Sequence, residues 1–320
     1  MNILWLYQYF ETYNMDDWLH LKYAKFIAEK YAGINLYLYG PNVHKVKDYY
    51  FLTPYHYNKN LKMRDLINHL KIDVIIINTK SRMFEYYNPF TKEARNCFLP
   101  DDFNKIKIPK IVIEEDFHYE ENDDWYYDVG IDLILQRHYS QAQRQGKVKT
   151  LWHPFSVDTK VFKDNKYIKR KNKVCFSGSC TDDAYEDRRN AFNELYNYDL
   201  VDIYGQRQKT GLSYINCLQS YVCHLSTKTK YDITAAKNFE IMSSGSVLLT
   251  NKFSGIDLLF PENSYVLFEN ENDIVQKAKK IIDDNSYRKE IVDNAIKCIN
   301  ENHSHEIRTK QLVNIIKKEL

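Results

Sequence analysis

Residues 231–245 (YDITAAKNFEIMSSG) hold the side chains best spaced for chemistry. Asp232 precedes a predicted helix, and Glu240 lies inside it after seven intervening residues. The start of this helix, near 235–238, offers backbone N–H groups and the positive end of the helix dipole, which together attract an anion. Lys237 adds a positive charge there. The Glu240 carboxylate can accept hydrogen bonds from both hydroxyls of a ribose. The segment predicts a diphosphate and ribose site, with ordinary helix capping as the alternative.

A second group of reactive side chains follows an apolar run in residues 108–118 (IPKIVIEEDFH). A strand here would end in acidic residues and His118, at the edge of a sheet. Asp116 or Glu115 could orient an acceptor hydroxyl or take its proton. No metal-ligand spacing accompanies them, so no metal is expected. The alternative is that His118 is a surface or core-edge histidine.

Short apolar runs alternate with amphipathic stretches in both halves of the chain, which predicts parallel sheets with helices on both faces. In the first half, strands are expected at 3–7, 34–39, 74–78, 110–114 and 133–135, and helices at 16–31 and 61–70. In the second half, strands are expected at 174–177, 200–204, 221–225, 247–250 and 265–268, and helices at 187–195, 213–219, 236–243, 273–283, 287–300 and 306–320. The fold class is therefore α/β, with two Rossmann-like domains facing across a cleft. Ligands bind such sheets beyond the carboxyl ends of the strands.

The boundary between the two halves is marked by a Pro-containing segment at 152–155 and a charged run at 163–173 (KDNKYIKRKNK), which we interpret as a solvated linker. We predict an N-terminal domain at 1–155 and a C-terminal domain at 156–302. The final segment, 303–320, is expected to be a helix that packs back toward the N-terminal domain.

The composition excludes several classes of protein. Only 9 of 320 residues are glycine, and neither a G-x-G-x-x-G nor a P-loop motif occurs, which argues against a nicotinamide site or a P-loop. The net charge is +2, so neither half is a basic nucleic-acid domain in bulk. Six scattered cysteines without C-x-x-C predict reduced thiols. No signal peptide or long apolar span is found, so we expect a cytoplasmic protein without a membrane span.

Several segments resemble GT-B glycosyltransferases, and most closely their group 1 and CgeB-type (spore-maturation-protein-like) members. Residues 238–251 (NFEIMSSGSVLLTN) and the sequence that follows resemble the C-terminal half of these enzymes. Residues 153–162 (HPFSVDTKVF) resemble their interdomain Pro-x-x-Val-Asp-x-x-x-Phe segment. Residues 176–179 (FSGS), followed by Arg188-Arg189, resemble their first C-domain strand, loop and helix. The resemblance is strongest over 150–318.

This resemblance implies a role for each matching residue. Glu240 aligns with the second Glu of the E-x7-E motif, which binds the donor ribose. Asp232 replaces the first Glu, which faces the transferred sugar, and its side chain is shorter. His118 would contact the donor sugar, so His118, Asp116 and Asp232 are the expected catalytic residues. The residues expected to bind the donor are Gly178, Ser179, Arg188, Lys237, Asn238 and Glu240. A solvated helix face for Arg188 and a plain turn for Gly178 are the alternatives.

The function implied is transfer of a sugar from a nucleotide sugar, a UDP-sugar above all, to an acceptor hydroxyl. The domain at 1–155 would then be acceptor-binding and the domain at 156–302 nucleotide-sugar-binding. The enzyme would be retaining, metal-independent and without a cofactor. The acceptor would be a saccharide, a cell-surface polymer or a protein. One alternative is a glycosyltransferase that modifies a base in DNA, which would need a basic groove such as Lys59, Lys62, Arg64, Lys80 and Arg82. The other is a non-catalytic nucleotide-sugar binder. The many N-terminal tyrosines suit stacking on a sugar or a base, or reflect coding bias.

Overall fold

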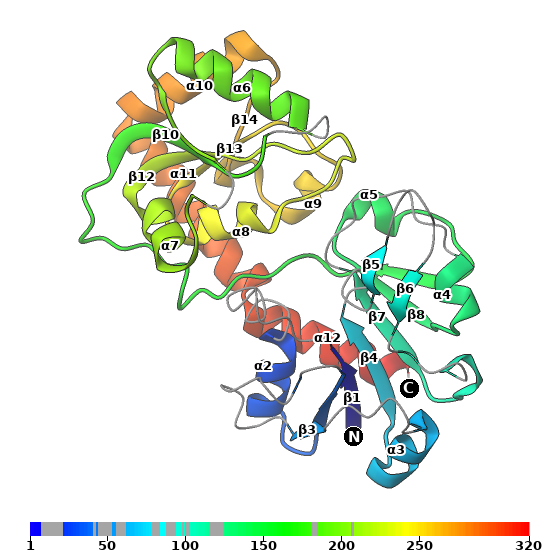
Figure 1. Cartoon of the computed structure of the whole chain (residues 1–320). Helices are drawn as coiled ribbons and strands as arrows, with labels where there is room; N and C mark the ends of the chain where they lie inside the picture. Colours follow the sequence, from blue (N-terminus) through cyan, green and yellow to red (C-terminus); the bar gives the residue numbers. More distant parts are fainter. Residues whose placement is uncertain are drawn as a thin grey trace. The chain divides into compact units, whose positions relative to one another are not determined.

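The chain folds into two compact units (Figure 1). The structure is a computed structural model that describes residues 1–7, 22–40, 43, 53–55, 62–78, 84–87, 94–97, 99, 103–114, 124–180, 185–205 and 208–319. Unit 1 comprises Met1–Arg137, Gln141–His153 and Thr309–Leu320. Unit 2 comprises His138–Ser140 and Pro154–Arg308.

Unit 1 is built on a seven-stranded parallel sheet with the strand order β3-β2-β1-β4-β7-β8-β9. Its strands are β1 (Asn2–Leu6), β2 (Asn35–Tyr39), β3 (Thr53–Tyr55), β4 (Val74–Asn78), β7 (Lys110–Glu114), β8 (Leu133–Gln136) and β9 (Lys149–Trp152). A separate antiparallel pair is formed by β5 (Phe84–Tyr87) and β6 (Ala94–Cys97). The helical elements that begin in this half are α2 (Lys22–Lys30), α3 (Met63–Leu70), η4 (Phe103–Lys105), α4 (Asp124–Asp128) and α5 (Tyr139–Ala142).

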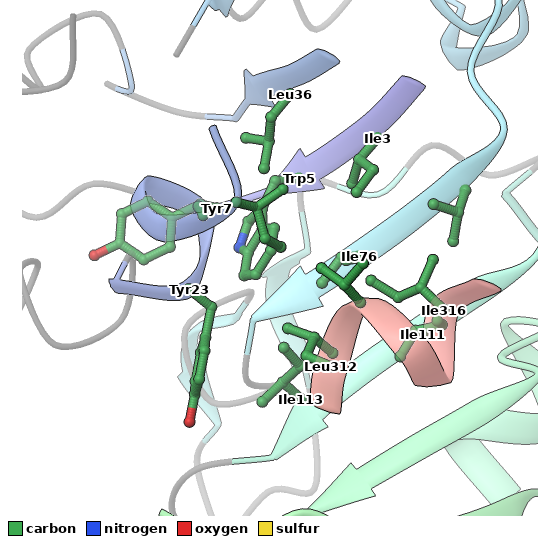
Figure 2. Packing of buried hydrophobic residues seen from close by; sticks show 14 of the residues in the cluster. Ile3, Trp5, Tyr7, Tyr23, Leu36, Ile76, Ile111, Ile113, Leu312 and Ile316 are labelled. Atoms are coloured by element: carbon green, nitrogen blue, oxygen red, sulfur yellow. The ribbon is translucent and has the colours of Figure 1, made fainter. Parts of the chain in front are cut away.

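The alternation of side chains along β1 explains why both faces of this sheet are covered. Ile3 and Trp5 point to one face and pack with α2 and with Leu312 of α12 (His305–Glu319), as Figure 2 shows. Leu4 and Leu6 point to the other face and pack with α3. Because successive residues of a strand face opposite sides, an all-apolar strand requires cover on both. One of these covers comes from the last helix of the chain.

Unit 2 is built on a five-stranded parallel sheet with the order β11-β10-β12-β13-β14. Its strands are β10 (Lys171–Ser177), β11 (Val201–Tyr204), β12 (Tyr221–Leu225), β13 (Val247–Thr250) and β14 (Val266–Leu267). Its helical elements are α6 (Glu186–Asn197), α7 (Gly211–Ser220), α8 (Ala236–Ser243), α9 (Ile256–Leu259), η6 (Glu262–Ser264), α10 (Glu271–Asp283), α11 (Asn285–Cys298) and the π-helical η7 (Ile299–His303). Along β10, Val174 and Phe176 join the core shared with α6 and α10, whereas Cys175 packs against Cys217 of α7.

These two parallel sheets confirm the predicted α/β fold class of two Rossmann-like units. A cleft between them stays a prediction. Four strands were not predicted, namely β3, β5, β6 and β9. The charged run at 163–173 is not a solvated linker throughout, because β10 begins at Lys171 and because Arg170 is tied into unit 2. The Arg170 guanidinium donates to the Tyr221 carbonyl at 3.0 Å and the Ser244 carbonyl at 2.6 Å. It also pairs with Asp164 at 2.9 Å.

Candidate functional site

The strand order of unit 2 determines where a ligand can bind. Counted along the chain from β10, the order is 2-1-3-4-5, so the connections leave the sheet in opposite directions on either side of the β10/β12 boundary. In open α/β sheets, ligands bind at this switch point, outside the carboxyl ends of the two strands. The residues there are 178–179 after β10 and 226–228 after β12. The predicted residues Gly178 and Ser179 therefore lie at the switch point.

Gly178 lies beside two positive side chains. Its φ of 145° lies in a region that favours glycine. A Cβ at this position would lie 2.9 Å from Lys237 Nζ and 4.0 Å from Arg188 Nη1. The glycine therefore keeps open the space in which an ammonium and a guanidinium converge, which is the arrangement that suits phosphate oxygens. A plain turn would not require these neighbours.

Arg188 of α6 connects the ends of the two switch-point strands. Its Nη1 donates to the Ser179 carbonyl at 2.6 Å. Its Nε and Nη2 lie 3.4 Å from Thr227 Oγ1 and the Thr227 carbonyl. The guanidinium also lies 4.3 Å from the centre of the Tyr185 ring. Only 9% of the residue is exposed, so the alternative of a solvated helix face does not hold for Arg188.

Lys237, one residue into α8, carries the second charge. Its ammonium donates to the Ser177 carbonyl, at the carboxyl end of β10. Burial, and after it the positive charge of Arg188, lower the pKa of Lys237 to about 8, although Glu240 opposes the shift. Two cations held together in a desolvated place repel each other, and a bound anion would relieve that repulsion. The electrostatics of the site thus favour a negatively charged ligand.

Glu240 lies one turn further along α8 and is 8% exposed. Its Oε2 accepts a hydrogen bond of 2.6 Å from the hydroxyl of Tyr214 in α7. Burial, and after it the charge of Glu240, raise the pKa of Tyr214 well above its ordinary value, so the hydroxyl stays a donor at neutral pH. Sequence reasoning missed Tyr214, because no local pattern relates it to a residue 26 positions away.

Asn238 and Asp232 have protein partners of their own. The Asn238 side-chain oxygen accepts from Ser226 Oγ at 2.7 Å, which ties the start of α8 to the end of β12. Asp232 has a φ of 54°, and its carboxylate accepts from both the backbone N–H, at 3.1 Å, and the hydroxyl of Ser254. The predicted contact of Asp232 with a transferred sugar stays a prediction.

The predicted residues of the N-terminal half are mostly not placed. Asp116 and His118 lie outside the described residues, as do Lys59, Lys80 and Arg82 of the proposed basic groove. Lys62 and Arg64 are exposed at the start of α3. Among the described side chains, His, Cys, Asp and Glu form no group of three that could hold a metal ion. None of the described helices is both long and apolar enough to cross a membrane.

Residues 164–314, which include every described residue of the site, match the family described as glycosyl transferase-like. No curated protein sequence is similar enough to match the chain. Among solved structures, a glycosyltransferase from Rickettsia africae is 12% identical, with a TM-score of 0.66 over 99% of this chain and 98% of that one.

Two further solved structures have the same architecture. The Anabaena protein Alr3699/HepE, in complex with UDP and glucose, is 12% identical, with a TM-score of 0.66 over 99% of this chain and 100% of that one. Sucrose-phosphate synthase from Thermosynechococcus elongatus is 10% identical, with a TM-score of 0.60 over 99% of this chain and 98% of that one. The chain has the GT-B fold. The family match, together with this fold, supports a glycosyltransferase. The narrower CgeB-type resemblance stays a prediction.

Proposed function

We propose that this chain transfers a sugar from a UDP-sugar to an acceptor hydroxyl, with unit 2 as the donor-binding unit. The observation that carries the proposal is the convergence of Lys237 and Arg188 on Gly178 at the switch point. The family match over unit 2 supports it, as does the UDP bound in the related fold of HepE.

In this proposal the diphosphate lies over residues 178–179, between the two cations and the N–H groups at the start of α8. Ala235 precedes that helix and has no side-chain acceptor to occupy those groups. Negative charge grows on the diphosphate as the glycosidic bond breaks, and fixed positive groups stabilise it most in a desolvated place. The Glu240 carboxylate accepts hydrogen bonds from the ribose hydroxyls.

We assign catalysis to Asp232, His118 and Asp116, with retention of configuration and without a metal. The acceptor would be held by unit 1 and would be a saccharide, a cell-surface polymer or a protein. We place the enzyme in the cytoplasm, because five cysteines of the described part of the chain are free thiols.

Thermal unfolding in the presence of nucleotides tests the donor assignment. A ligand at about 100 times its Kd stabilises the folded state by about 2.7 kcal/mol, so UDP and its sugars should raise Tm by several degrees. An NMR assay then follows the anomeric proton of the product with each acceptor class. No Tm shift with any nucleotide would refute the donor site, and an inverted product would refute retention.

A non-catalytic nucleotide-sugar binder is the second candidate, since the Asp232 carboxylate is engaged by Ser254. Asp232→Asn distinguishes the two, because the amide oxygen can still accept from Ser254 while the charge is lost. A catalytic Asp232 predicts that sugar transfer is lost with UDP binding intact. Tight UDP binding without turnover by the wild type, whatever the acceptor, would favour the binder.

A further inference from the structure

The hydrogen bond between Tyr214 and Glu240 has the geometry of a strong contact to a charged group. Its length of 2.6 Å lies in the range typical of O–H···O⁻ bonds. A carboxylate that is 8% exposed needs such a donor, because burying an unsatisfied charge is costly. The bond also stops rotation about the last torsion of the Glu240 side chain. The plane of the carboxylate is thereby fixed.

Tyr214 is itself held by both helix and loop contacts. It lies in the first turn of α7, which starts with a capping box between Thr210 and Ser213. The ring of Phe162 packs edge-on against the Tyr214 ring, at 6.3 Å between centroids and an angle of 70°. The Phe162 carbonyl accepts from Ser243 Oγ, at the end of the helix that carries Glu240. Phe162 therefore contacts both α7 and α8.

The Phe162 backbone is anchored in turn. Its N–H donates to the Asp158 carbonyl at 2.8 Å, and the Asp158 side chain accepts from the N–H of Lys160 at 2.9 Å. A turn stabilised in this way holds the Phe162 ring in one place. The path from Asp158 through Phe162 and Tyr214 consists of packed or hydrogen-bonded groups throughout, and it ends on the Glu240 carboxylate.

We infer that Tyr214 is a positioning residue that sets the sugar selectivity of the nucleotide site, by holding the Glu240 carboxylate in the orientation that recognises ribose hydroxyls. The inference rests on the proposed donor site. It makes the site selective for ribonucleotides over 2′-deoxyribonucleotides. The diphosphate contacts of Lys237 and Arg188 do not involve Tyr214, so selectivity and diphosphate affinity are separable.

Isothermal titration with UDP and 2′-deoxy-UDP measures the selectivity as the ratio of the two Kd values. A hydrogen bond to a charged group predicts a ratio of about tenfold or more for the wild type. Tyr214→Phe removes one oxygen and leaves the ring that packs on Phe162. The ratio should fall below about threefold, while the Kd for inorganic pyrophosphate stays within about twofold of the wild type.

Tyr221→Phe is the matched control. The Tyr221 hydroxyl also donates to a carboxylate, Asp202, at 2.7 Å. Tyr221 is the first residue of β12, at the opposite end of that strand from the site. This variant should keep the wild-type ratio. A loss of selectivity equal to that of Tyr214→Phe would mean that any lost tyrosine–carboxylate bond has this effect, and would overturn the inference.

A double-mutant cycle with Glu240→Gln separates positioning from general destabilisation. If Tyr214 acts through Glu240, Tyr214→Phe should not lower the ratio further in the Glu240→Gln background. The inference would be overturned if the two substitutions lowered the ratio of Kd values additively. It would also be overturned if Tyr214→Phe kept the wild-type ratio. A wild type that binds UDP with a ratio near one would also overturn it and leave the donor site standing. A wild type that binds no UDP would instead refute the proposed function.

Discussion

The ammonium group of Lys237 hydrogen-bonds to the Ser177 carbonyl and lies only 2.9 Å from where a Cβ on Gly178 would be. The side chain of Lys237 in α8 thus reaches the backbone at the end of β10, 60 residues earlier in the sequence. Gly178 has no Cβ that would stand in its way. The contact explains why this chain, which contains few glycines, keeps one at the end of β10.

Gly178→Ala should therefore weaken UDP binding by about tenfold and lower the free energy of unfolding by about 1–3 kcal/mol, because the new methyl group displaces Lys237 and strains the backbone. Isothermal titration and urea unfolding measure the two effects. Gly33→Ala is the matched control, since Gly33 also has a positive φ, of 85°, but has nothing within 4 Å of a Cβ. Gly33→Ala should lower the free energy of unfolding and leave the Kd for UDP unchanged. Wild-type UDP affinity in Gly178→Ala would contradict the assignment.

Binding of UDP should weaken as the pH rises through about 8. Lys237 loses its proton near that pH in the free protein, and a bound diphosphate favours the charged form. Titrations between pH 7 and 9 should show the Kd rising toward the alkaline end. Lys237→Met, with the same ligand, should bind more weakly and show a smaller change over the same range. An identical pH profile in the variant would exclude Lys237 as the titrating group.

Unit 2 should lose stability in mild acid because of His303. Burial, and after it the charge of Arg308, lower the pKa of this side chain to about 3, and its Nε2 lies 2.9 Å from the Leu259 carbonyl. The unfolded chain takes up a proton near pH 6.5 that the folded chain does not, so stability falls as the pH falls below 6.5. Between pH 6.5 and 5.5, His303 alone should account for a loss of about 1 kcal/mol. Urea unfolding at pH 6.5, 6.0 and 5.5 measures it, and His303→Gln should reduce the slope by that amount.

The core of unit 1 should depend on the C-terminal helix. Leu312 of α12 is fully buried among Ile3 and its neighbours, so Leu312→Ala should lower the free energy of unfolding by about 2–5 kcal/mol (Figure 2). Asn314→Ala, on the exposed side of the same helix, should change it by less than about 0.5 kcal/mol. Chemical unfolding followed by tryptophan fluorescence checks both variants. Equal stability of the two would contradict the packing of α12.

Much of the fold was predictable, because buried parallel strands form short apolar runs with turn residues after them. The segment 74–78 and strand β13 are clear cases. The strands missed are less apolar: β3 (TPY), β9 (KTLW) and the β5–β6 pair have no such run. The buried contacts of Arg170 were missed because a charged run normally predicts side chains exposed to solvent. Here the Arg170 guanidinium instead donates hydrogen bonds to backbone carbonyls far along the chain.

The sequence indicated part of the candidate site, and the binding role of its residues stays a prediction. The pattern around Lys237 and Glu240 follows from the helix start that carries it, so local sequence was sufficient. Tyr214 and Phe162 act through contacts made only when α7, α8 and the 158–162 turn pack together. No spacing rule relates them to Glu240. Their role depends on tertiary packing alone. His118 and Asp116 lie outside the described part of the chain.

The packing of α12 also has a consequence for the order in which the chain folds during synthesis. Domains commonly fold from the N-terminus as the ribosome releases them. The sheet of unit 1 contains the first strand of the chain, yet one of its faces is covered by Leu312 and Ile316. At about 5–20 residues per second, these residues emerge roughly 15–60 seconds after β1. That part of the apolar face of the N-terminal sheet therefore stays uncovered while unit 2 is synthesised. During that time the nascent chain presents a hydrophobic surface that chaperones would recognise.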